Sequence, residues 1–228
     1  MPEMNQELSI PPADPIQNKP KFSAFTKGIA KLISILFHPL FISSYVFAFL
    51  IFIHPASYSG VEERLKVFRF LTIFLFNAFF PGFAVFLAWR LGFVNSITLQ
   101  TVRERIIPYI LAMFFYWWTW NVFHNLPDSP PEAMRFTLGA FLAICGGWLW
   151  NIYFKISMHA IAVGGLLMFM ILFSAQDPFA SGVYLSVTVF VTGLVMTARF
   201  IVSDHSQAEI YSGLITGMLA QWVASWIY

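Results

Sequence analysis

The stretch ISMHAIAVGGLLMFMILF, residues 156–173, decides the fold class of this chain. Apart from Ser157 and His159 near its start it has no polar side chain, and its length approaches the roughly 20 apolar residues that carry an α-helix across a bilayer. The apolar runs lack the alternating polarity of membrane β-strands. The sequence therefore predicts an all-α fold, a polytopic transmembrane helical bundle with six or seven spans, formed by the runs 29–53, 67–89, 106–123, 136–154, 156–173, 183–198 and 210–227.

The composition supports this interpretation. Hydrophobic residues make up 58% of the 228 residues and charged residues only 11%, whereas soluble domains carry about 25% charged residues. The net charge of +2 is too small to indicate nucleic-acid binding. Residues 1–25 are polar and rich in proline, so we expect a mobile N-terminal tail there, followed by a single transmembrane domain at 26–228. The expected location is the bacterial inner (cytoplasmic) membrane, with the protein integral to it.

The charged residues gather on one side of the predicted bundle. If every run spans the bilayer, the tail and the stretches 90–105, 155–159 and 199–209 lie on the same face. Charges beside spans are costly and usually face a bundle interior or a water-filled cavity. We therefore expect one polar pocket at this membrane edge, to which six side chains contribute: Arg103, Arg105, Lys155, His159, Arg199 and His205.

The number of spans and the side that the pocket faces stay open at this stage. If the first run is re-entrant and bends at His38-Pro39, six spans result and the tail lies on the opposite face from the pocket. Lys and Arg outside the pocket are shared almost evenly between the two faces, so the positive-inside rule does not decide. His38, His54 and His124 lie at or near run ends and are interpreted as interfacial or capping residues.

The predicted pocket is suited to a phosphate group. Guanidinium groups pair with phosphate oxygens through two parallel hydrogen bonds, and a lysine adds a further positive charge. Ser157 and His159 begin the run 156–173, where unpaired backbone N–H groups and the helix dipole attract anions. A phosphate is therefore the expected guest.

His205 and Glu209 are four residues apart, which places them within hydrogen-bonding reach on one face of the last helix if that helix begins near His205. The carboxylate can then fix the tautomer of the imidazole. An imidazole oriented in this way can act as a nucleophile, while His159 protonates the leaving oxygen as general acid. These residues predict phosphoryl transfer without a metal ion or another cofactor, and the lone Cys145 supports no cysteine metal site.

The same residues resemble motifs of the type 2 phosphatidic acid phosphatase superfamily, the lipid phosphate phosphatases. The third motif of that family, S-R-x5-H-x3-D, is similar to ARFIVSDHSQAE at 198–209, with Glu209 in the aspartate position. The second, P-S-G-H, is similar to ISMH at 156–159, with Met158 in place of glycine. RERIIP at 103–108 is similar to only part of the first motif, K-x6-R-P: arginines and a proline are present, but the spacing of the motif is absent. The chain thus resembles a divergent member over roughly half of its length.

The resemblance implies a membrane hydrolase that removes phosphate from a lipid monophosphate or diphosphate in the bilayer, or transfers it, through a phosphohistidine. His205 would form this intermediate, Glu209 would orient His205, and His159 would protonate the leaving group. Arg105 is preferred to Arg103 because it lies closer to Pro108, and Lys155 would replace the missing lysine of the first motif. The residues implied in phosphate binding are Arg199, Ser157, Arg105, Arg103 and Lys155.

Two alternatives remain open. Glu209 and Met158 depart from the family pattern, which leaves a catalytically degenerate protein that binds a phospholipid. A transporter of organic anions would use the same basic pocket without chemistry. The particular lipid and the oligomeric state also stay open, since Gly213 and Gly217 would allow two helices to approach closely either within or between chains.

Overall fold

The computed structural model describes residues 22–94, 101–177, 179 and 182–228. These residues form helices joined by turns, with no strand among them, which confirms the predicted all-α fold. Most of the predicted tail, 1–25, lies outside the described residues. The elements, with η for short π- or 3₁₀-helical segments, are α1 Ala24–Leu36, α2 Pro39–Ala48, η1 Phe49–Ile53, α3 Glu63–Phe74, η2 Leu75–Phe79, α4 Phe80–Arg90, η3 Arg103–Arg105, α5 Ile106–Asn125, α6 Pro131–Asn151, α7 Met158–Gln176, α8 Gly182–Val202 and α9 Gln207–Ile227.

By length and composition, five helices among the described residues are suited to cross a membrane: Glu63–Arg90, Arg103–Asn125, Pro131–Asn151, Met158–Gln176 and Gly182–Val202. The pair Ala24–Leu36 and Pro39–Ile53 makes a sixth if it is one broken span, because its halves meet at an angle of 60°. The helix α9 has 21 residues but does not join the five, since polar residues such as Gln221 interrupt it. The structure thus offers five or six candidate spans, where we expected six or seven.

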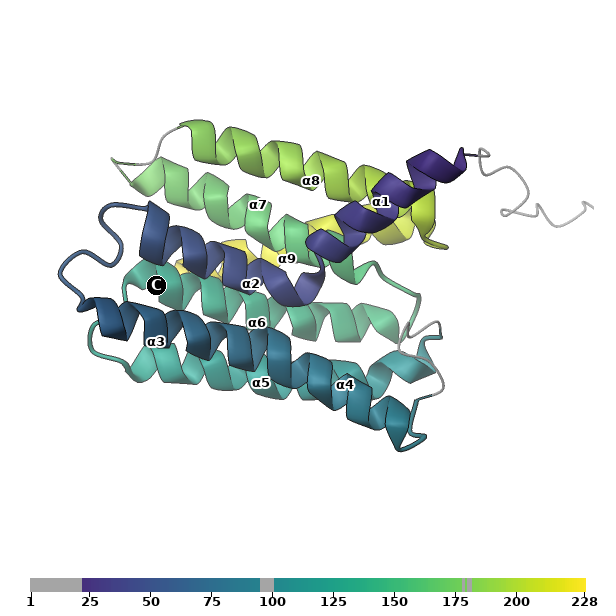
Figure 1. The fold of residues 1–228 in the computed structure, drawn as a ribbon, viewed down its shortest axis with the longest axis horizontal. Helices are drawn as coiled ribbons and strands as arrows, with labels where there is room; N and C mark the ends of the chain where they lie inside the picture. Colours follow the sequence, from purple (N-terminus) through teal and green to yellow (C-terminus); the bar gives the residue numbers. More distant parts are fainter. Residues whose placement is uncertain (1–21, 95–100, 178, 180–181) are drawn as a thin grey trace, which may run out of the picture.

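The helix α9 packs on the bundle through one face and is exposed on the other, as at Tyr211, Ile215 and Trp226. It packs mainly against α7 and α6, and α5 and α8 flank these two helices on either side. The helix α1 packs on α8, whereas α2 lies over α7 and beside α3 (Figure 1). Gln221 lies on the packed face of α9 and is 2% exposed, so its polar side chain is kept inside the bundle.

The connections alternate between the two ends of the bundle (Figure 1). The segments between α4 and α5, between α6 and α7 and between α8 and α9 lie at one end, here named the site end. The segments between η1 and α3, between α5 and α6 and between α7 and α8 lie at the other. The stretches 101–105, 155–159 and 199–209 therefore share one end, as the alternation of apolar runs predicts.

Glycines allow α7 and α9 to approach closely. A Cβ added to Gly217 would lie 2.0 Å from the carbonyl oxygen of Ile161, and one added to Gly164 would lie 2.1 Å from that of Leu214. Because the neighbouring atoms belong to helical backbone, neither helix can yield without moving as a whole. Gly213 likewise faces the start of α7. The predicted close approach thus occurs within one chain.

Replacing Gly217 with alanine is expected to destabilise the protein by about 1–3 kcal/mol, the usual cost of overpacking, because the new methyl group meets the backbone of α7. Gly193→Ala in α8 is the matched control: its Cβ would meet nothing within 4 Å, so helix propensity should stabilise it by up to about 1 kcal/mol. The midpoint of thermal unfolding in one detergent measures both. A midpoint for Gly217→Ala equal to that of the wild type would contradict this packing.

The break between α1 and α2 follows from the pair His38-Pro39. The Nδ1 atom of His38 accepts a hydrogen bond from Leu40 N (3.4 Å), and Pro39 occupies the first helical position, where a missing N–H costs nothing. The capping role predicted for His38 is confirmed. Because the break lies near the start of α7, it brings the end of α1 to the predicted site.

Candidate functional site

Arg105 enters the site end from the start of α5. Its side chain is buried, and its Nη1 atom donates a hydrogen bond to Ile156 O (2.9 Å) in the α6–α7 connection. The turn before it is held from α6, since Asn151 Nδ2 donates to Val102 O (3.0 Å). The side chain of Arg103 is exposed. Of the two arginines predicted from RERIIP, Arg105 is therefore the one that points into the protein.

Ser157 and His159 are positioned by the start of α7. Ser157 is fully buried and caps this helix, because its Oγ atom accepts a hydrogen bond from Ala160 N (3.4 Å). Its backbone N–H donates to Glu209 O (3.2 Å), which joins the starts of α7 and α9. His159 Nε2 lies 3.0 Å from Ser34 O and must donate, since a carbonyl only accepts. The nitrogen of this ring left for a ligand is Nδ1.

Arg199 lies in the last turn of α8 and is half-buried. Its carbonyl oxygen accepts hydrogen bonds from both the backbone N–H (3.1 Å) and the hydroxyl of Ser203, which ends the helix and turns the chain toward α9. The side chain of Asp204 is exposed in this connection. The helix end thus presents the Arg199 guanidinium at the site end.

His205 is only 5% exposed and lies in the connection that precedes α9. The helix begins at Gln207, so His205 stands just before it and not on its first turn. Ser206 and Glu209 form a capping box, in which Glu209 Oε2 accepts from Ser206 N (2.7 Å). The same Oε2 atom lies 3.5 Å from His205 Nδ1, an ion-pair distance that exceeds a normal hydrogen bond. The predicted pairing is therefore present, but loose.

Positive charges surround His205. Burial, together with the nearby charges of Arg105 and Arg199, lowers the pKa of His205 to about 4, while the carboxylate of Glu209 opposes this shift and Lys155 adds to it. The imidazole is therefore neutral at physiological pH and keeps a lone pair on one nitrogen. His159 is also within electrostatic range of Arg199 and His205. We call this group the cationic histidine cluster; its members are Arg105, Lys155, His159, Arg199, His205 and Glu209.

Two buried nitrogen atoms in this cluster have no hydrogen-bond partner among the described residues, namely Arg199 Nε and His205 Nδ1. An unsatisfied buried polar group costs about 1–3 kcal/mol, and more when it is charged. An oxyanion would accept hydrogen bonds from the guanidinium, and its negative charge would balance the positive side chains of the cluster. The arrangement is therefore suited to a phosphate.

His38 is a neighbour of this cluster that the sequence did not predict. The ring centroids of His38 and His159 lie 5.4 Å apart, at an interplanar angle of 79°. The carbonyl of Ser34, which fixes the orientation of His159, comes from the same break in the chain. The pair His38-Pro39 indicates a helix break in the sequence, but it does not indicate against which helix the bent segment packs.

His54 lies at the opposite end of the bundle. Its Nδ1 atom accepts a hydrogen bond from Ser57 N (3.2 Å), and its Nε2 atom lies 2.7 Å from Asp177 Oδ2. These contacts tie the connection after η1 to the end of α7. His54 therefore has a structural role away from the cluster.

Of the predicted site residues, Arg103 is the one with an exposed side chain; the others line or border the cluster. No group of three or more His, Cys, Asp or Glu side chains in the described part of the chain is arranged to hold a metal ion. Comparisons with protein-family models, with curated proteins and with solved structures found no match to this chain.

Proposed function

We propose that this chain is an integral membrane protein of the bacterial inner membrane, in which the long helices form a transmembrane bundle. Large apolar side chains on its surface support this, such as Phe68, Phe190 and Trp226, which are 72%, 65% and 75% exposed. Soluble monomers rarely expose extended apolar surface, whereas lipid tails solvate it without cost. The five helices of sufficient length and apolar character add to this argument.

We further propose that the protein is a lipid phosphate phosphatase, a divergent relative of the type 2 phosphatidic acid phosphatases. The observation that carries this proposal is the convergence of Arg105 and Arg199 on the buried, neutral imidazole of His205, with His159 close by. Two guanidinium groups match the oxygens of a phosphate. A neutral imidazole held beside that phosphate is a nucleophile.

The first step transfers the phosphoryl group to the protein. Because Glu209 lies on the Nδ1 side of His205, the lone pair that attacks phosphorus is on Nε2. The new P–N bond forms as the P–O bond to the lipid breaks. When the monoester binds as a monoanion, its proton can pass through Nδ1 of His159 to the departing oxygen, so that the lipid alcohol leaves neutral. Arg105 and Arg199 stabilise the charge on the remaining oxygens.

The second step hydrolyses the phosphohistidine. Water attacks phosphorus, the P–N bond breaks and its electron pair returns to Nε2 of His205. One proton of the water passes to Nδ1 of His159 and then to the released phosphate. Both histidines regain their starting protonation, and the products are a lipid alcohol and inorganic phosphate.

A binding or transport function is the second candidate, and the position of Glu209 favours it. The Oε2 atom of Glu209 is 2.7 Å from Ser206 N but 3.5 Å from His205 Nδ1, so helix capping is its closer contact. His159 in turn uses Nε2 for Ser34 O. In that case the cluster would hold a phospholipid headgroup or an organic anion, and no bond would break.

The test is the release of inorganic phosphate from phosphatidate or a polyprenyl diphosphate by the purified protein in detergent. Because the proposed steps use side chains alone, we expect release to continue at the same rate in the presence of EDTA. Lipid binding without any phosphate release would favour the second candidate. Absence of both binding and release would refute both functions.

A further inference from the structure

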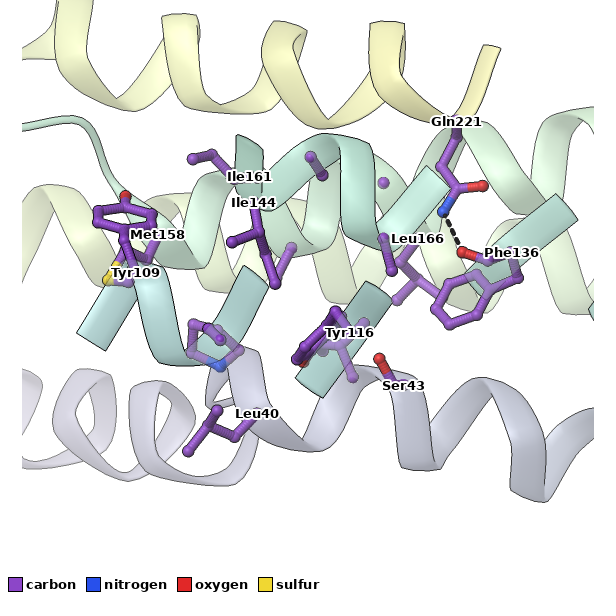
Figure 2. A pocket seen from close by; sticks show the side chains of 17 residues that line it. Leu40, Ser43, Tyr109, Tyr116, Phe136, Ile144, Met158, Ile161, Leu166 and Gln221 are labelled. Atoms are coloured by element: carbon purple, nitrogen blue, oxygen red, sulfur yellow. Dashed lines mark hydrogen bonds between the residues drawn. The ribbon is translucent and has the colours of Figure 1, made fainter. Parts of the chain in front are cut away.

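A mostly apolar cavity of about 100 Å³ lies between the helices and is lined by α2, α5, α6, α7 and α9. Figure 2 shows its lining, with Tyr109 and Met158 toward one end and Phe136 and Gln221 toward the other. The volume of the cavity is close to that of an engineered apolar cavity of about 150 Å³ that binds benzene, so it has room for a slender apolar group. The proposed reaction at the cluster does not itself require this space.

One end of the cavity adjoins the cationic histidine cluster. Met158, which lines the cavity, directly precedes His159, and Pro39 lines it at the start of α2. Tyr109 lies about one helical turn after Arg105 and is close enough to interact with it electrostatically. The hydroxyl of Tyr109 is buried and lacks a hydrogen-bond partner among the described residues. A polar atom of a ligand between the cluster and the apolar space would accept a hydrogen bond from this hydroxyl.

Gln221 closes the other end. It is 2% exposed, and its Nε2 atom donates a hydrogen bond to Phe136 O (3.1 Å; Figure 2). Its carboxamide fills the space beside Gly139, where an added Cβ would lie 2.3 Å from Gln221 Cδ. Gln221 also lines a second cavity of about 310 Å³, which includes Glu132 and Arg135. A buried amide thus separates the apolar cavity from a more polar one.

We propose that the apolar cavity receives the hydrocarbon chain of the lipid phosphate whose headgroup the cluster binds, and that Gln221 sets the longest chain it accepts. The inference rests on the proposed function for the choice of headgroup. The charge of the cluster attracts the phosphate, and the lining of the cavity is mostly apolar. An ester or glycerol oxygen at the junction accepts a hydrogen bond from Tyr109, whose hydroxyl is otherwise unsatisfied.

The size of the cavity limits the chain. Along α7 the lining extends from Met158 to Leu166, which is about 12 Å at 1.5 Å per residue. Each methylene that moves from water into the cavity improves affinity about fourfold. A longer chain meets Gln221 and must either fold back or displace its amide from Phe136 O. Affinity should therefore rise with chain length and then level off.

The test is a competition series of alkyl phosphates, from octyl to octadecyl, against a fluorescent alkyl phosphate in one detergent. His205→Asn protein is used so that no turnover occurs. In Gln221→Ala, affinity should keep rising to longer chains before it levels off. Ala112→Phe, which fills the cavity from α5, should weaken the longer chains at least about tenfold. Partition into micelles is common to all variants, so ratios between variants report the cavity.

Ile110→Phe is the matched control, because Ile110 lies on the same helix but is 50% exposed outside the cavity. It should leave the dependence on chain length unchanged. If Ala112→Phe does not fold, Ala140→Leu narrows the same cavity from α6. A photoreactive group at the end of the alkyl chain should label Phe136 or Leu166 near the closed end.

The outcomes separate this inference from the proposed function. Labelling at Phe136 or Leu166, combined with no phosphate release by the wild type, would support the cavity and refute hydrolysis. The cavity inference would be overturned if affinity depended on chain length in the same way in every variant and only exposed side chains were labelled. Phosphate release by the wild type would then leave the proposed function intact.

Discussion

Replacing His205 with asparagine is expected to reduce the rate of phosphate release at least about 10³-fold, because His205 is the nucleophile of the proposed reaction and His159 serves as its proton donor. Asparagine keeps the polarity of the position and avoids a cavity. The rate is measured as inorganic phosphate released from phosphatidate in detergent. Rapid quenching of the wild type with radiolabelled substrate should also trap a phosphoprotein that is labile in acid and stable in alkali, and the variant should yield none.

Asp204→Asn is the matched control for this prediction. Asp204 is the neighbouring residue in the same connection, but its side chain is exposed and takes no part in the proposed steps. It should retain activity within about twofold, in line with the small effects of exposed charges. Substantial activity in His205→Asn, with an unfolding midpoint equal to that of the wild type, would rule out the phosphohistidine.

Arg199→Gln is expected to lower kcat/KM about 10²–10³-fold, the usual cost of losing one preorganised group that stabilises charge in a transition state. Glutamine retains hydrogen-bond donors but not the positive charge, and Arg199 Nε is a buried donor without a partner among the described residues. The loss should be larger in kcat than in the affinity for the lipid alcohol product, because that product carries no phosphate. Steady-state rates and product inhibition measure the two effects.

Arg90→Gln provides the comparison for Arg199→Gln. Arg90 ends α4 at the same end of the bundle, but it is exposed and lies over the ring of Trp89. Its removal should change kcat/KM by no more than a few fold. Equal losses for the two variants would mean that general positive charge at this end attracts the lipid, and would contradict a specific phosphate contact by Arg199.

Much of the fold follows from the sequence because each long apolar run forms its own helix. Helix formation depends on hydrogen bonds within the run and on local signals at its start, as with Ser157 at α7 and the Ser206 and Glu209 capping box at α9. Alternation of direction then assigns each connection to an end of the bundle. For this reason the sequence alone predicts His159 and His205 at the same end of the bundle.

The finer arrangement of the cluster was not predictable because it depends on how helices rotate and tilt against one another. The sequence favours Arg105 over Arg103 only by position, whereas the structure buries one and exposes the other. The place of His38 beside His159 results from a 60° bend between two helices, and no local pattern specifies the direction of such a bend.

The sequence by itself determined the all-α class, the order of the charged stretches and the end of the bundle at which they meet, since hydrophobic run lengths and chain direction suffice for these. Tertiary packing decided which side chains face one another. Gly213 of α9 faces the start of α7, Gly217 continues this close approach, and Gln221 lines the apolar cavity because α9 packs against both α6 and α7. Such contacts join residues far apart in the chain. They depend on the shapes of the packed side chains, which the periodicity of apolar residues in the sequence does not specify.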